Sequence, residues 1–317
     1  MNIKPICCAV LFLATSTLCA SNILKLSNHP LSMVLCEFVQ TDNVLDMALA
    51  NDGYFMLSNG ENDGGVLFTR YGNFRLNSES QIVNESGLNL LGINKKSAPN
   101  KLSKLKIPTN NLPPKTTSKI DIAINLPTMA SDDEVLTTTT TLYDSISKHH
   151  ELKVDYKKIS HSTWTAQVSI DNVSLNQGTL YFDNSGVFSK QDGLSHIQWQ
   201  TDFGVNDLKI DHTESTATAS PFSIQLIANN GYPVGSLSRL EIDINGFIFL
   251  VYSNGQSKRL KHTIAVAKFL NPNYLKRVQD HLYMPTDKSG PLRLHRLNSA
   301  GAILTGNLEP DPCPNIA

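Results

Sequence analysis

The sequence predicts an all-β protein in which a discontinuous inner β domain carries an inserted outer domain, a small β-sandwich or barrel. Three observations support this fold class. Short runs that alternate apolar and polar residues recur along the chain, which is the pattern of half-buried strands. Gly, Asn, Asp and Pro residues separate these runs at short intervals, as turn residues do. After residue 21 no segment shows the apolar period of a helix, so we expect none.

The inner domain is expected to consist of residues 22–129 and 213–309. Its first hairpin lies in residues 52–76, where strand patterns flank a loop rich in Gly, Asn and Asp. One face of this hairpin is expected to carry Tyr54, Met56, Phe68 and Arg70, and the other Phe55 and Leu57. Further strands are expected at Lys119–Leu126, Phe222–Leu226, Arg239–Ile244, Phe247–Tyr252 and Ser257–Phe269.

The outer domain is expected at residues 130–212, because the acidic turn at 131–134 and the threonine run after it mark a boundary. Its strands are expected at Leu152–Tyr156, Trp164–Val168, Gly178–Phe182 and His196–Trp199. Alternating neighbours place Trp164 and Trp199 over the interior. Residues 95–114 are polar and Pro-marked and are expected to form a long surface excursion, and residues 310–317 a Pro-rich tail.

Residues 1–21 have the pattern of a signal peptide. Lys4 gives a short positive region, and Ile6–Leu18 is an apolar stretch too short for a membrane span. Small residues in Cys19–Ser21 allow cleavage there. An uncleaved anchor is the alternative, whereas a lipoprotein is disfavoured because Leu18 stands immediately before Cys19. We therefore expect a periplasmic or secreted protein without a stable membrane span after cleavage.

The composition limits the function classes. The chain has 317 residues, enough for two domains, and a formal net charge of −1 at pH 7. A charge this close to zero gives no footprint for nucleic acid or an anionic membrane. No glycine-rich phosphate loop, no CxxC motif and no obvious pair of catalytic carboxylates is found in the sequence. We expect no cofactor and no enzyme activity.

The order of motifs resembles that of the bacterial flagellar hook and rod proteins, which form one axial family. The strongest block reads Asp-Gly-Tyr-Phe at 52–55 and Thr-Arg-x-Gly-x-Phe at 69–74, and matching segments follow as far as residue 309. Segments at 141–154 and 234–278 are similar to the hook protein in particular. The motif residues are Asp52, Gly53, Tyr54, Phe55, Thr69, Arg70, Gly72, Phe74, Gly87, Tyr143, Asp144, Ser145, Gly235, Asn245, Gly246, Asn254 and Gly255.

The resemblance implies a structural or interaction protein whose partner is another protein. Hook subunits carry a helix at each end, and these pair to drive polymerisation. No heptad precedes residue 44 here, and Pro310, Pro312 and Pro314 exclude a helix after residue 309. We therefore expect an exported relative that does not polymerise, a monomer or weak oligomer. Its partner would be a flagellar axial protein or an unknown extracytoplasmic or host protein. The alternative is a genuine hook component of the flagellum with degenerate termini.

Two cysteines, Cys36 and Cys313, remain outside the expected signal peptide. The family's two ends run side by side, so the resemblance implies that these cysteines are close enough to bond. In an oxidising compartment their disulfide would close nearly the whole chain and stabilise it by up to about 5 kcal/mol. Two unrelated free thiols are the alternative.

One segment has the spacing of a calcium loop. Glu241, Asp243 and Asn245 alternate and Gly246 follows, but the twelfth position of such a loop is Tyr252, which cannot chelate. The flanks alternate as strands do, so a hairpin about Asn245-Gly246 is the preferred interpretation.

Histidines of the outer domain are the remaining candidates for a metal site or a catalytic base. His149 and His150 would point to opposite faces of a strand, and we expect them in a turn. Ser145, His161 and Asp171 could be drawn as a triad, but no nucleophile elbow surrounds Ser145. Asp144 and Ser145 are instead expected to hold a turn through backbone hydrogen bonds. A secreted enzyme that uses these residues and His196 is the least favoured alternative.

Overall fold

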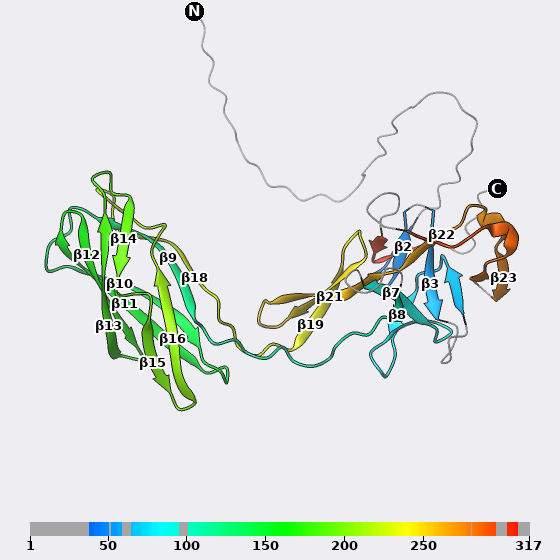
Figure 1. The fold of residues 1–317 in the computed structure, drawn as a ribbon, viewed down its shortest axis with the longest axis horizontal. Coiled ribbons are helices and arrows are strands. Elements are labelled where there is room, and N and C mark those ends of the chain that lie inside the picture. The colour runs from blue at the N-terminus through cyan, green and yellow to red at the C-terminus, as the bar shows by residue number, and fades with distance from the viewer. Residues whose placement is uncertain are drawn as a thin grey trace, which may run out of the picture.

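The computed structural model describes residues 38–50, 52–58, 65–94, 101–279, 281–295 and 303–309. Over these ranges the chain forms strands and two short 3-10 helices, η1 (Pro272–Tyr274) and η2 (Asp287–Ser289), and no α-helix. The predicted all-β class is therefore confirmed. Figure 1 shows two groups of strands joined by two chain segments, which we call the inner and outer modules. None of the described segments forms an apolar helix long enough to span a membrane.

The outer module is a sandwich of two sheets. One sheet has the order β10-β11-β12-β13-β14, and the other has the order β15-β16-β9-β17 with β18 also paired to β9. The strands are β9 (Lys119–Pro127), β10 (Val135–Tyr143), β11 (His149–Ser160), β12 (Thr163–Ile170), β13 (Val173–Phe182), β14 (Phe188–Asp192), β15 (Ile197–Thr201), β16 (Gly204–Asp211), β17 (Thr216–Thr218) and β18 (Ser223–Asn229). Strict alternation in β12 buries every second residue, including Trp164, and Trp199 of β15 lies in the same core. Both tryptophans are inside, as predicted.

The inner module is built from both ends of the described chain around a long sheet with the order β19-β20-β21-β7-β3-β4-β24-β23. The strands before the outer module are β1 (Val39–Gln40), β2 (Met47–Leu49), β3 (Tyr54–Ser58), β4 (Val66–Thr69), β5 (Phe74–Leu76), β6 (Ile82–Asn84), β7 (Asn89–Asn94) and β8 (Leu102–Lys104). Those after it are β19 (Leu237–Ile242), β20 (Phe247–Tyr252), β21 (Ser257–Ile264), β22 (Val266–Lys268), β23 (Lys276–Gln279), β24 (Leu282–Met284), β25 (Arg293–His295), β26 (Ile303–Thr305) and β27 (Asn307–Leu308).

The hairpin β3–β4 lies between two apolar clusters. Phe55 and Leu57 belong to the larger cluster, whereas Met56 and Phe68 belong to the cluster on the other face. This is the predicted division of faces, since successive side chains of a strand point to opposite sides of its sheet. The aromatic ring of Phe55 meets that of Phe74 edge to face at 5.3 Å within the larger cluster.

The two ends of the described chain lie side by side. Strand β1 pairs antiparallel with β27, with Val39 opposite Leu308, and β2 pairs antiparallel with β26. These pairings join the first and last described strands of the inner module.

The two hydrophobic cores divide the chain at positions different from those expected. Ile120, Ile124 and Ala217 belong to the outer core, so β9, β17 and β18 are part of the outer module. The acidic segment 131–134 is a turn inside this module, where the Glu134 N–H donates to the Ser131 carbonyl at 3.1 Å. The outer core therefore takes in residues from 120 to 217, beyond the expected limits of 130 and 212, because β9 and β10 belong to facing sheets of one sandwich.

The connection between the modules is more ordered than a surface excursion. Leu105, Ile107 and Leu112 are buried in the inner core, which corrects the expectation for this part of residues 95–114. The two connecting segments also pair with each other: the Leu112 N–H donates to the Gly235 carbonyl at 2.7 Å, and the Lys115 N–H donates to the Tyr232 carbonyl at 2.9 Å. A double-stranded connection thus links the modules (Figure 1).

Candidate functional site

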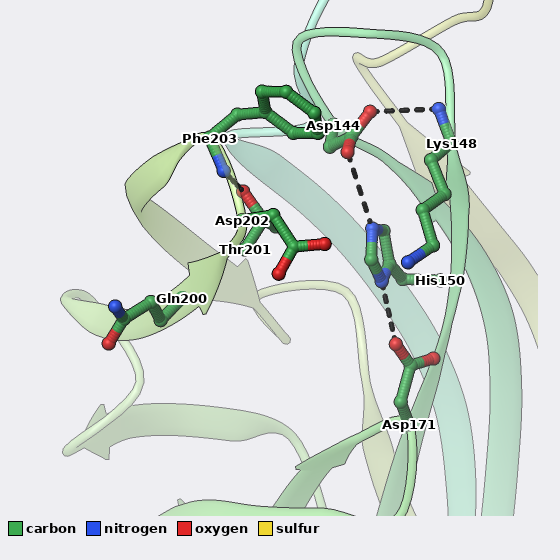
Figure 2. Close-up of a pocket in the computed structure, with 8 residues that line it drawn as sticks. All are labelled: Asp144, Lys148, His150, Asp171, Gln200, Thr201, Asp202 and Phe203. Carbon is green, nitrogen blue, oxygen red and sulfur yellow. Dashed lines mark hydrogen bonds and ion pairs between the residues drawn. The ribbon is translucent and has the colours of Figure 1, made fainter.

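Three turns at one end of the outer module enclose a polar pocket of about 430 Å³. They connect β10 to β11, β12 to β13, and β15 to β16. The lining residues are Asp144, Lys148, His150, Asp171, Gln200, Thr201, Asp202 and Phe203 (Figure 2).

His150 occupies the inner wall of this pocket. Alternation along β11 leaves His149 exposed and buries His150, whose side chain is 6% exposed. Its Nδ1 lies 2.6 Å from Asp171 Oδ2, and its Nε2 lies 3.6 Å from Asp144 Oδ2. The imidazole also meets the Trp199 ring edge to face at 5.0 Å. The two histidines face opposite sides as predicted, but they begin a strand and do not lie in a turn.

Asp144 fixes the turn between β10 and β11. Its Oδ1 accepts hydrogen bonds from the backbone N–H groups of Ile146 at 3.0 Å and Lys148 at 2.8 Å. This is the predicted role of Asp144, whereas Ser145 is simply exposed in the same turn. The second carboxylate oxygen, Oδ2, is buried beside His150 without a hydrogen-bond partner.

Asp171 holds His150 from the opposite side. Its backbone has a φ of 49° in the turn between β12 and β13, and its Oδ1 accepts the Glu151 N–H at 2.9 Å. Partial burial of this carboxyl works to raise its pKa, but the hydrogen bonds from His150 and from Glu151 outweigh burial and hold the pKa below its usual range. Asp171 is therefore ionised at physiological pH.

Ser145, His161 and Asp171 could be drawn as a triad in the sequence. In the structure the histidine that contacts Asp171 is His150. His196 lies on the surface with its Nδ1 3.1 Å from Asp207 Oδ2. Sequence reasoning missed the grouping of Asp144, His150 and Asp171. Their approach depends on strand register, which puts Leu142 opposite His150 and Leu152 opposite Ile170, and alternation alone does not give that register.

The segment that resembled a calcium loop is a hairpin. It joins β19 to β20, and Asp243 Oδ1 accepts the N–H groups of Asn245 at 2.9 Å and Phe247 at 2.8 Å. The carboxylate is thus used by the turn itself, as the preferred interpretation required. Across the described part of the chain, no group of three His, Cys, Asp or Glu side chains is placed to hold a metal ion.

The strongest sequence motif forms a clamp in the inner module. Arg70 Nη2 and Nε bind the Glu309 carboxylate at 2.7 and 2.8 Å. Arg70 Nη1 also donates to the Gly53 carbonyl and Nη2 to the Leu49 carbonyl, each at 3.0 Å. One guanidinium therefore joins the hairpin β3–β4 to residues near both ends of the described chain, with the bidentate geometry that arginine favours.

Glycines of the motif allow close backbone approach. A Cβ atom at Gly72 would lie 1.7 Å from the Met47 carbonyl oxygen, so no other residue fits without moving β2. A Cβ atom at Gly235 would lie 2.6 Å from the Asn254 side chain, which donates to the Pro233 carbonyl at 2.7 Å. These motif residues contribute to packing and chain geometry. Cys36 and Cys313 lie outside the described residues.

Two family models match the chain. The flagellar hook protein FlgE/F/G D1 domain matches residues 48–135, and the flagellar basal body protein FlaE D2 domain matches residues 111–232. The flagellar hook protein FlgE of Borreliella burgdorferi is 28% identical over 323 residues, covering 86% of this chain and 72% of that protein. The Salmonella typhimurium FlgE is 26% identical over 310 residues, covering 85% and 73%.

A solved structure shares the fold. The crystal structure of the Helicobacter pylori flagellar hook protein FlgE2 superposes with a TM-score of 0.66 at 14% sequence identity. The superposition covers 86% of this chain and 100% of that chain.

Proposed function

We propose that this chain, recognised by two domain models and by its relatives as a flagellar hook FlgE-family protein, acts as a non-enzymatic structural component of the hook type. The observation that supports this most is the correspondence between the matched domains and the modules. The D1 match, residues 48–135, covers the first part of the inner module and runs on into β9 of the outer module, and the D2 match, residues 111–232, covers the double connection and the outer module. Hook-like sequence and hook-like tertiary structure therefore coincide.

The place of action that follows from the relatives is the flagellar hook. Every curated relative named above is a flagellar hook protein, and contacts with other flagellar axial proteins are the interactions that such a component would make. Residues 1–21 favour a second candidate, an exported relative that stays in the periplasm or is secreted and does not polymerise. That candidate stays a prediction, since residues 1–21 and 310–317 lie outside the described part of the chain.

Deletion of the gene in the bacterium that encodes it separates the two candidates. A hook component is expected to be required for motility, and the wild-type gene is expected to restore swimming and hooks. If the protein is an exported relative, deletion of its gene is expected to leave motility unchanged. The protein would then be recovered from the periplasm or medium of wild-type cells. Loss of an enzymatic reaction without any effect on the cell surface would contradict both.

We also propose that Cys36 and Cys313 form a disulfide when the protein is exported. The pairing of β1 with β27 supports this proposal, because Cys36 shortly precedes Val39, Cys313 shortly follows Leu308, and those two strand residues are directly opposite. Such a bond would act on the same end of the inner module as the Arg70–Glu309 ion pair.

A further inference from the structure

Strand β10 forms one edge of the first sheet of the outer module. It pairs with β11 over nine consecutive positions without a bulge, and in the described part of the chain no strand pairs with its other side. Tyr143 shows which backbone groups face outward, because its N–H donates to Thr117 Oγ1 at 2.9 Å and its carbonyl accepts the Thr117 N–H at 2.8 Å. Tyr143 therefore points away from β11, and so does every second residue before it in the strand.

The chain itself closes only one end of this edge. Asn229 Nδ2, in β18, donates to the Thr141 carbonyl at 3.1 Å. Among the described residues, none forms a hydrogen bond with the outward N–H and C=O groups of Val135, Thr137 and Thr139, which we call the free edge. An open row of backbone donors and acceptors is a template for another strand.

The free edge lacks the features that keep other edges from pairing. Edge strands are commonly protected by charged side chains, proline or a bulge. At the opposite edge of the same sheet, β14 carries Lys190 and Asp192 and pairs through a bulge. The edge strands β19 and β23 of the inner module also carry charged side chains and bulges. Strand β10 has no charged residue, no proline and no bulge, so none of these features opposes a further strand there.

The free edge is complementary to itself. When two copies are antiparallel with Thr137 opposite Thr137, Val135 of each copy lies opposite Thr139 of the other. Every residue of the free edge then faces an outward-pointing residue, so each pair can exchange both of its backbone hydrogen bonds. The facing side chains are β-branched and uncharged, which favours contact across the strands and brings no like charges together.

Apolar side chains border the free edge. Val135 is 54% exposed. Ile224 of β18 lies opposite the core residue Ile124 and so is on the core side of its sheet, yet it is 49% exposed. The hydrogen bond from Asn229 to Thr141 places β18 and β10 at the same side of the sandwich. The exposure of Ile224 therefore marks an open seam between these two strands, which a second copy would cover.

We propose that two copies of this chain associate through β10, antiparallel about Thr137, and join their five-stranded sheets into one continuous sheet. A twofold pair of this kind closes at two copies. The inference concerns the free protein and goes beyond the proposed function, because it holds equally for a hook component before assembly and for an exported relative.

Sedimentation velocity of the full chain over a range of concentrations tests the association, and amide hydrogen exchange locates it. The wild type is expected to pass from monomer to dimer as the concentration rises. The amide protons of Thr137 and Thr139 point to solvent in a single copy, so they are expected to exchange more slowly in the dimer. No such change is expected in β14, at the opposite edge of the sheet.

Variants at the centre of the pair give the sharpest comparison. Thr137→Pro removes an outward N–H without removing a bond to β11, and it is expected to raise the dissociation constant at least about ten-fold. Thr137→Lys and Thr137→Glu each place like charges opposite one another, and each should raise the constant about three- to five-fold. An equimolar mixture of these two charge variants should associate more tightly than either alone. Gln177→Lys, exposed on the inner strand β13 of the same sheet, is the control and should have no effect.

Four outcomes would overturn the proposal. These are a wild-type chain that stays monomeric up to about 1 mM, a dimer that Thr137→Pro leaves intact, a mixture of the charge variants no tighter than either alone, or growth beyond two copies that no Thr137 variant slows. If Thr137→Pro does not fold, the two charge variants at this exposed position still decide the question. The presence or absence of the protein in the hook changes none of these measurements.

Discussion

The outer module is expected to lose stability in mild acid because of one buried histidine. His212 follows β16 and is 0% exposed, and its Nε2 lies 2.9 Å from the hydroxyl of Tyr156. Its backbone N–H donates to Gln191 Oε1 at 2.9 Å, and its ring meets the Tyr156 ring edge to face at 5.6 Å. Burial lowers the pKa of His212 from 6.5 to about 4, although the nearby Asp211 carboxylate works in the opposite direction.

The direction of this pH dependence is set by whether the folded or the unfolded chain binds the proton of His212 more readily. Below pH 6.5 an unfolded chain protonates this histidine, whereas the folded chain keeps it neutral down to about pH 4. The free energy of unfolding is therefore expected to fall as pH drops through this window and to lose about 3 kcal/mol in all. Asp211 has its pKa lowered to about 2, chiefly by hydrogen bonding from Thr213, so its contribution is lost at lower pH.

Urea unfolding followed by tryptophan fluorescence measures this change. The chain has two tryptophans, Trp164 and Trp199, and both are buried in the outer core, so the signal reports on that module. Unfolding free energies at pH 7 and pH 4.5 would be compared for the wild type, His212→Gln, and the control His149→Gln at an exposed position. His212→Gln should flatten the dependence and the control should keep it. An equal slope in all three proteins would refute the reasoning.

Three further predictions concern the inner module. In thermal melts, Gly72→Ala is expected to lower the unfolding free energy by more than about 3 kcal/mol or to prevent folding, because the new Cβ meets a backbone oxygen. The control Gly255→Ala, at a φ of 76° in open space, should cost about 1 kcal/mol. Arg70→Ala should cost about 1–3 kcal/mol and speed amide exchange in β1 and β27, whereas unchanged exchange would contradict the clamp. Mass measurement of the exported protein should find Cys36 and Cys313 oxidised to one disulfide, and two free thiols would end that proposal.

Local pattern was enough to predict much of the fold. Alternation in the hairpin β3–β4 gave the two faces of the strand, because side-chain direction depends only on the neighbouring residues. The turn residues Asp243 to Gly246 gave the hairpin in place of a metal loop for the same reason. Both predictions needed no information about distant parts of the chain.

Features set by distant contacts were not predictable in this way. The alternation in β9 is the same whichever core it joins, so its place in the outer module came only from pairing with β16, β17 and β18. The contacts of His150 with Asp144 and Asp171 arise from two strand registers, and a one-residue shift in either would separate them. Site geometry therefore required the tertiary structure.

The most direct test of the central proposal is immunogold electron microscopy of hook–basal bodies isolated from the bacterium, with antibodies raised against the outer module. A structural protein of the hook type is expected to place gold along the hook of wild-type cells and nowhere on cells that lack the gene. Unlabelled hooks, with all the protein recovered as a free monomer, would contradict a structural role in the hook.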